Sequence, residues 1–190
     1  GKTYIYLRLL RGNPEIATAK KVFKSMPIWT LYRSNGQAII KMYEEMPQLT
    51  RTLVFAPEFK NAELYFPSKS DCFIDPFFGP TLELLMINYL AQEKGVIIHS
   101  CGIAVNRKGI LFVGESGAGK STIARLWDQQ KSAKVLSDDR TIVRKKGKNF
   151  RIYGTPWHGE AKFGKPKGVK LEKIFFLRHG QDNNIQKING

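Results

Sequence analysis

A stretch of eight residues constrains this chain more than any other feature of its sequence. Residues 114–121 read Gly-Glu-Ser-Gly-Ala-Gly-Lys-Ser and match the pattern G-x-x-x-x-G-K-[ST] in full. An apolar run, residues 110–113, precedes them, and residues 122–130 follow with Ile123 and Trp127 on one side of an expected helix. The sequence therefore predicts a buried strand, a glycine-rich loop and a helix, in that order.

Each fixed position of this pattern helps to hold a phosphate. Glycines let backbone N–H groups turn inward around an anion, and the helix N-terminus adds donors and a positive dipole end. Lys120 can reach the β- and γ-phosphates, and the Ser121 hydroxyl is a hard ligand suited to Mg²⁺. The expected nucleotide-binding residues are Gly114, Glu115, Ser116, Gly117, Ala118, Gly119, Lys120, Ser121 and Thr122. The residues do not separate ATP from GTP, and the alternative is a glycine-rich turn that only caps a helix.

Two adjacent aspartates follow the next expected strand, residues 133–136. A helix and a return strand fit the distance in sequence between Ser121 and Asp138, so this turn is expected beside the phosphate-binding loop. Phosphoryl transfer needs a carboxylate near Mg²⁺ and often a second that accepts the proton of the nucleophile. We expect Asp138 and Asp139 to divide these roles, with Asp138 as a metal ligand beside Ser121. The alternative is a solvated turn or an ion pair with Arg140.

The expected strand at residues 96–105 carries a histidine and a cysteine on one face. His99 is a candidate neighbour of the active site, and the alternative is a histidine whose partners lie in or beside the sheet. Cys101 is interpreted as a small apolar residue, because nothing in the sequence indicates a lowered thiol pKa.

The first 78 residues carry no recognisable chemistry and are interpreted as a small antiparallel β-rich region. We expect a strand at 3–10, a short helix over 13–23, a hairpin at 28–43 and a strand pair at 52–66. Asn35 and Gly36 accept the positive φ of a type I′ turn. A helix over 80–94 then opens the nucleotide-binding domain, residues 79–190.

Composition limits the class of protein. The 190 residues carry a net charge of +15, which favours anionic partners. No apolar run spans a bilayer, so we expect no membrane-spanning segment. The two cysteines, Cys72 and Cys101, are too few for a disulfide framework, which makes the cytoplasm the default compartment.

Taken in order, the residues around His99, the loop beginning Gly114-Glu115-Ser116-Gly117, and Ser137-Asp138-Asp139-Arg140 resemble the catalytic domain of HPr kinase/phosphorylase and its relatives. The resemblance implies an α/β fold with a mixed sheet and P-loop, similar to phosphoenolpyruvate carboxykinase. It also implies ATP- and Mg²⁺-dependent phosphorylation of a hydroxyl, typically that of serine. His99 becomes an active-site neighbour, Lys120 the phosphate clamp, and the two aspartates the metal and base pair.

The sequence departs from the HPr enzymes downstream of these motifs. Their signature E-[IV]-R-G-x-G is absent, so the chain resembles a relative, with a peptide, a protein or a small molecule as acceptor. Residues 154–160 stand in that neighbourhood, and Trp157, His158 and Glu160 are candidate acceptor contacts; the alternative is a surface turn. The C-terminal helices of the family are missing, so we expect the chain to end within its catalytic domain.

Basic residues gather in the second half of the chain. Residues 99–190 hold 19 basic and 7 acidic side chains, a net charge of +12, against +3 for residues 1–98. Residues 144–148 are expected at a hairpin tip, and Lys162–Lys173 in a loop. This stretch is a solvated loop, a surface for phosphate or acceptor, or a nucleic-acid surface, for which the interleaved aromatics are sparse.

Three functions remain open from the sequence. The main hypothesis is an ATP-dependent kinase, and the alternatives are a nucleotide-binding regulatory module without transfer chemistry and a nucleic-acid-dependent NTPase. The acceptor and the oligomeric state stay open.

Overall fold

The computed structural model describes residues 4–16, 18–25, 28–44, 48–68, 75, 80–182 and 184–188. The chain forms two compact units, Gly1–Met86 and Ile87–Gly190, and the boundary lies within helix α1 (Pro80–Leu90). The sequence predicts this boundary at residue 78.

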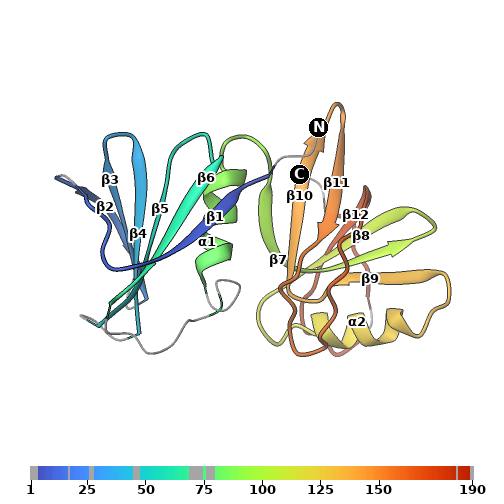
Figure 1. Cartoon of the computed structure of the whole chain (residues 1–190). Helices are drawn as coiled ribbons and strands as arrows, with labels where there is room; N and C mark the ends of the chain where they lie inside the picture. Colours follow the sequence, from blue (N-terminus) through green and yellow to red (C-terminus); the bar gives the residue numbers. More distant parts are fainter. Residues whose placement is uncertain are drawn as a thin grey trace. The chain divides into compact units, whose positions relative to one another are not determined.

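The first unit is built on a six-stranded sheet (Figure 1). Its strands are β1 (Tyr6–Arg11), β2 (Lys20–Ser25), β3 (Trp29–Ser34), β4 (Gln37–Tyr43), β5 (Leu49–Phe55) and β6 (Asn61–Phe66). Their order across the sheet is β1-β6-β5-β4-β3-β2, and β1 pairs with β6 in parallel while the other pairs are antiparallel. The prediction of an antiparallel region is therefore wrong for one pair, because β1 returns beside β6 in the same direction.

Local turn chemistry explains the centre of this sheet. Asn35 and Gly36 have φ of 47° and 78°, as a type I′ turn requires, and the predicted hairpin of β3 and β4 is confirmed. Strand β6 alternates between buried and partly exposed positions, with Ala62, Leu64 and Phe66 in the core. This period of two is the pattern of a strand with one face on the core.

The helix predicted over residues 13–23 is wrong. Lys20–Ser25 is strand β2, which pairs with β3, and its Val22 and Phe23 side chains are 56% and 53% exposed. Within the described part of the chain, no apolar surface covers the residues that suggested a helix. The backbone of β2 pairs instead with the open edge of β3. Phe23 packs at the surface, where its ring lies 5.4 Å from the ring of Trp29.

The second unit contains another six-stranded sheet and a helix (Figure 1). Its elements are β7 (Val96–Val105), β8 (Lys108–Val113), α2 (Lys120–Asp128), β9 (Ala133–Ser137), β10 (Arg140–Lys146), β11 (Asn149–Gly154) and β12 (Gly168–Phe176). The strand order is β10-β11-β12-β8-β7-β9, with an added pairing of β10 to β7. Only β12 and β8 pair in parallel among these strands of the described chain.

Strand β7 changes partner along its length. Its first half, Val96 to His99, pairs with β10, and its second half, Gly102 to Val105, pairs with β9. Because β10 also pairs with β11, the pairings run β7–β8–β12–β11–β10 and return to β7. Five buried side chains from this circuit, one from each strand, pack together with Leu136 of β9: Ala104, Leu111, Val143, Ile152 and Val169.

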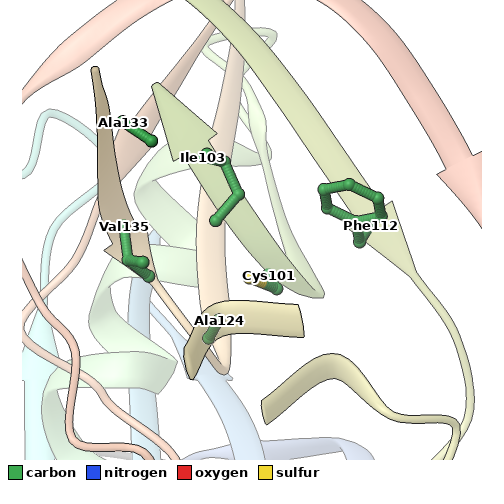
Figure 2. Packing of buried hydrophobic residues seen from close by; sticks show 6 residues of the cluster. All are labelled: Cys101, Ile103, Phe112, Ala124, Ala133 and Val135. Atoms are coloured by element: carbon green, nitrogen blue, oxygen red, sulfur yellow. The ribbon is translucent and has the colours of Figure 1, made fainter. Parts of the chain in front are cut away.

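A second buried cluster lies between this sheet and helix α2. Figure 2 shows Ala124 of α2 beside Cys101 of β7, with Ile103, Phe112, Ala133 and Val135 completing the cluster. Helix α2 contacts β7 and β9, so this apolar contact determines how the helix after the phosphate-binding loop sits on the sheet. Cys101 is a free, fully buried cysteine, whereas Cys72 lies outside the described residues.

The expected α/β fold, similar to phosphoenolpyruvate carboxykinase, is wrong. Strands hold 49% and helices 12% of the described residues, in two mixed six-stranded sheets with two helices. The P-loop pattern predicts only a local strand, loop and helix, and most other connections are tight antiparallel hairpins that need no crossover helix. The expected basic loop at Lys162–Lys173 is also wrong in part, because Lys170 and Lys173 lie on β12.

No helix in the described ranges combines the length and the apolar character needed to cross a membrane.

Candidate functional site

The loop predicted to bind phosphate, residues 114–121, joins β8 to α2 as the sequence predicts, and it is called the phosphate-binding loop for that prediction. Strand β8 ends at Val113, and α2 begins at Lys120 with Gly119 as its N-terminal cap. Gly117 and Gly119 have φ of 83° and 94°, a left-handed conformation that side chains with a Cβ rarely adopt. These two glycines therefore give the loop a backbone path that other residues would strain.

Lys120 crosses the loop from the first turn of α2. Its Nζ donates to the carbonyl oxygens of Gly114 and Glu115 at 2.8 and 2.7 Å, and only 6% of the residue is exposed. An ammonium has three donors, so two hold the start of the loop and one is left for an anion. The lysine is therefore pre-positioned at the loop before any ligand contact is made.

Ser100 of β7 lies between the loop and the aspartate pair. On one side it is in register with Val113, the last residue of β8. On the other side its backbone N–H donates to the carbonyl oxygen of Asp139 at 2.9 Å. Strand register thus brings the start of the loop and the Asp138–Asp139 turn to the two flanks of one residue, as expected for a shared site.

The carboxylate of Asp138 is occupied by backbone donors. The residue is 2% exposed, and its carboxylate accepts N–H groups from Gly159, Ala161 and Phe163 at 3.0, 2.8 and 3.2 Å. A Cβ on Gly159 would lie 3.0 Å from Asp138 Oδ2, so only glycine fits this approach without a shift. Asp138 therefore holds residues 159–163 against the site, a task that the sequence did not indicate.

Asp139 points to a different set of partners. Its Oδ1 lies 2.7 Å from Nη1 of Arg140 and 3.1 Å from Nε2 of His99. Strand pairing places Arg140 opposite His99, so β7 and β10 bring the three groups together. The ion pair with Arg140 considered from the sequence is present, and it coexists with the contact to His99.

The environment of His99, whose side chain is 47% exposed, lowers the pKa of the imidazole and so favours its neutral form. Burial lowers its pKa most, the positive charge of Lys120 lowers it further, Asp139 acts in the opposite direction, and Arg140 lowers it again. The ring nitrogen Nε2 lies 3.1 Å from Asp139 Oδ1, so the carboxylate is the nearest acidic group to the imidazole. The influence of Lys120 indicates that the histidine and the phosphate-binding loop share one electrostatic environment.

Cys101 behaves as a core residue. Burial, followed by the negative charge of Asp138, raises the pKa of its thiol to about 12. A thiol with such a pKa is protonated at neutral pH and is a poor nucleophile. This agrees with the interpretation of Cys101 as a small apolar side chain.

The three candidate acceptor contacts lie on the loop that Asp138 holds. Trp157 is half-buried, and its carbonyl oxygen accepts a hydrogen bond from Ser137 Oγ at 3.1 Å. His158 and Glu160 are exposed on either side of Gly159. The structure thus brings this loop to the aspartates through its backbone.

Ser137 and Thr155 are site residues that sequence reasoning missed. Both are buried hydroxyls, and Ser137 Oγ also accepts N–H groups from Asp139 and Arg140 at 3.3 and 3.1 Å. Thr155 Oγ1 donates to the carbonyl oxygen of Arg140 at 2.6 Å. A serine directly before two aspartates is a signal for such a turn, because serine hydroxyls commonly bond to the backbone nearby.

The described side chains do not form a complete metal site by themselves. Among the described residues, no group of three His, Cys, Asp or Glu side chains converges on one point. The Ser121 hydroxyl and one carboxylate fit Mg²⁺, which retains waters and takes most other ligands from phosphates. The donor set therefore fits a metal that arrives with a nucleotide.

Comparison of the chain with protein-family models gave no match, and no curated protein matched it.

Proposed function

We propose that this chain is an ATP- and Mg²⁺-dependent phosphotransferase that acts on a hydroxyl group. The observation that carries the proposal is the pairing around Ser100, which brings the loop holding Lys120 and the Asp139–His99–Arg140 group to one strand. The resemblance of these motifs to HPr kinase relatives supports a serine of a peptide or protein as the acceptor.

The phosphate-binding loop has the donors to hold the β- and γ-phosphates. The backbone N–H groups at the start of α2 have no intrahelical partner, and the helix dipole favours an anion there. Lys120 adds a positive charge that two carbonyl oxygens orient at the loop, as electrostatic stabilisation of a transferred phosphoryl group requires. Bound Mg²⁺ supplies charge neutralisation on the phosphate oxygens, with Ser121 as its ligand from the loop.

Asp139 is the better candidate for accepting the proton of the nucleophile. The contacts with Arg140 and His99 both fall on Oδ1, so we assign the proton-accepting role to the other oxygen, Oδ2. His99 and Arg140 hold its orientation. An acceptor hydroxyl would pass its proton to this carboxylate as its oxygen attacks the γ-phosphate.

Asp138 is assigned a positioning role. A carboxylate offers about four acceptor positions, and three at Asp138 are filled by N–H groups. The metal role expected for it is thereby limited to one remaining position, such as a contact with a water of the Mg²⁺ shell. Through residues 159–163 it holds Trp157, His158 and Glu160 where an acceptor would bind.

The experiment is incubation of the full chain with Mg²⁺, γ-labelled ATP and a library of serine-containing peptides. We expect label on a peptide and a fall in kcat of at least about 100-fold in Asp139→Asn, because general-base catalysis typically contributes that much. Asp182→Asn, an exposed aspartate outside the site, is the control. ATP hydrolysis with no labelled peptide would overturn the kinase, and ATP binding without turnover would favour a regulatory module.

A further inference from the structure

The carboxyl ends of two parallel strands meet beside the phosphate-binding loop. Strands β8 and β12 are in register up to Val113 and Phe176, and the N–H of Leu177 donates to the carbonyl oxygen of Val113 at 2.7 Å. Because β12 is the neighbour of β8 on the side away from β7, this edge is separate from the aspartate pair. In sheets with parallel strands, ligands commonly bind just beyond such carboxyl ends.

A cavity of about 710 Å³ opens at this edge. One wall is formed by the start of the phosphate-binding loop, residues 114–116 with Ala118, and the other by residues 176–179 with Ile188. The volume is in the range of small-molecule and cofactor sites. The loop is therefore open to a sizeable ligand on the side of β12.

Large apolar side chains line the wall opposite the loop. Phe176 is 60% exposed and Ile188 is 68% exposed. The preceding residue, Phe175, turns the other way and stacks on Phe112 with ring centroids 5.3 Å apart. Phe176 therefore makes no contribution to that core and presents its ring to the cavity.

A guanidinium and an imidazole accompany the apolar wall. Arg178 and His179 are exposed and line the same cavity. A guanidinium plane stacks on aromatic rings and also attracts phosphate. Apolar, aromatic and planar cationic groups next to a phosphate loop are the combination that an aromatic base joined to a phosphate chain requires.

We infer that this cavity holds the nucleoside of the nucleotide whose phosphates bind at residues 114–121. The base packs against Phe176 and Ile188, and Arg178 lies between the base and the phosphates. The inference rests on the proposed function for the phosphates and adds the place and the chemistry of base recognition. Because stacking uses a face that every base offers, ATP and GTP should bind with similar affinity.

The test compares a nucleotide with a phosphate chain that has no nucleoside. Mg·ATP, Mg·GTP and Mg·tripolyphosphate are titrated calorimetrically into the full chain and into Phe176→Ala. We expect ATP to bind wild type about tenfold or more tightly than tripolyphosphate, and Phe176→Ala to lose about tenfold for ATP while tripolyphosphate is unchanged. Ile174→Ala is the matched control, because Ile174 lies on the same strand, is 47% exposed and does not line the cavity.

The outcomes separate the two proposals. Equal binding of ATP and tripolyphosphate by wild type, or an unchanged ratio in Phe176→Ala, would overturn the nucleoside site and leave the phosphate site standing. Absence of binding by all three ligands would overturn the proposed function and this inference with it. Ile188→Ala is a second variant on the same wall, and it should lower the ATP affinity in the same direction.

Discussion

The two units contain sheets of the same size that are used in different ways. Each has six strands and one parallel pair among the described residues. In the first unit the parallel pair includes the edge strand β1, and most strands are joined by short hairpins. In the second unit the parallel strands β8 and β12 end side by side, where the chain leaves as irregular loops. The candidate site lies at the second arrangement, because loops that leave a sheet bring free backbone donors that tight hairpins use internally.

The two units also differ in how their buried charged side chains are bonded. In the described part of the first unit, Arg51 is 7% exposed, and its Nε and Nη1 have no hydrogen-bond partner. In the second unit, Lys120 and Asp138 are equally buried, but each is bonded to backbone groups of a loop. The second unit therefore uses buried charge to order loops, and changes at these three residues and at their neighbours Asp139 and His99 test this contrast.

Lys120→Ala should have the largest effect. Loss of the ammonium removes the fixed charge at the loop, so we expect Mg·ATP affinity to fall by at least about 100-fold, since charge-assisted contacts are strong in such sites. Isothermal titration calorimetry measures the affinity. Lys134→Ala, an exposed lysine on β9, should bind like wild type, and retained affinity in Lys120→Ala would remove the phosphate assignment.

The aspartates should separate stability from chemistry. Asp138→Ala leaves three N–H groups without their acceptor, so the free energy of unfolding should fall by about 3 kcal/mol. Asp139→Ala, where the side chain is 25% exposed, should lose less than about 1 kcal/mol. Denaturant unfolding followed by circular dichroism measures both, with the exposed Asp128→Ala as control. Equal losses in the two variants would show that the adjacent aspartates do not divide their roles.

Arg51→Met, unlike Asp138→Ala, should not lower the free energy of unfolding. Methionine fills a similar volume without unpaired polar atoms, so the free energy of unfolding should stay the same or rise by about 1 kcal/mol. Arg33→Met, on the exposed face of β3, is the control for changing the charge. A clear loss of stability would mean that Arg51 orders a part of the first unit as Lys120 does in the second.

His99 provides the smallest and most local effect. NMR titration of its ring should show a pKa below the ordinary value of about 6.5, and Lys120→Ala should raise that pKa while Asp139→Asn lowers it further. A lowered pKa means that the unfolded chain binds the proton more readily. Stability should therefore decline as the pH falls below about 6.5. An unchanged His99 pKa in Lys120→Ala would show that the histidine and the phosphate-binding loop do not share one electrostatic environment.

Sequence reasoning located the features that depend on neighbours in the chain. The phosphate-binding loop, the turn at Asn35 and Gly36 and the hairpin of β10 and β11 were predicted because each is determined by a few consecutive residues. The helix over 13–23 failed for the opposite reason. Three apolar residues at helical spacing carry little information until a partner surface is known, and the available partner was the edge of β3.

The candidate site was predicted as a set of residues and not as an arrangement. The identity of Lys120, Asp138, Asp139 and His99 came from motif spacing. The motif spacing did not predict the separate roles of these residues. Those roles depend on which loop the Asp138 carboxylate contacts, and that loop lies more than twenty residues further along the chain. Phe176 and Arg178 belong to no motif, and only the parallel pairing of β12 with β8 brings them to the loop.

The sequence by itself determined the strand, loop and helix around Lys120, since backbone conformation over a few residues follows from glycine, apolar and capping positions. The tertiary structure decided the mostly β class and the change of partner along β7. It also decided the meeting of the loop with the aspartates at Ser100. These depend on pairings between residues distant in the chain, where many registers satisfy the same local pattern and the burial of both apolar clusters selects one.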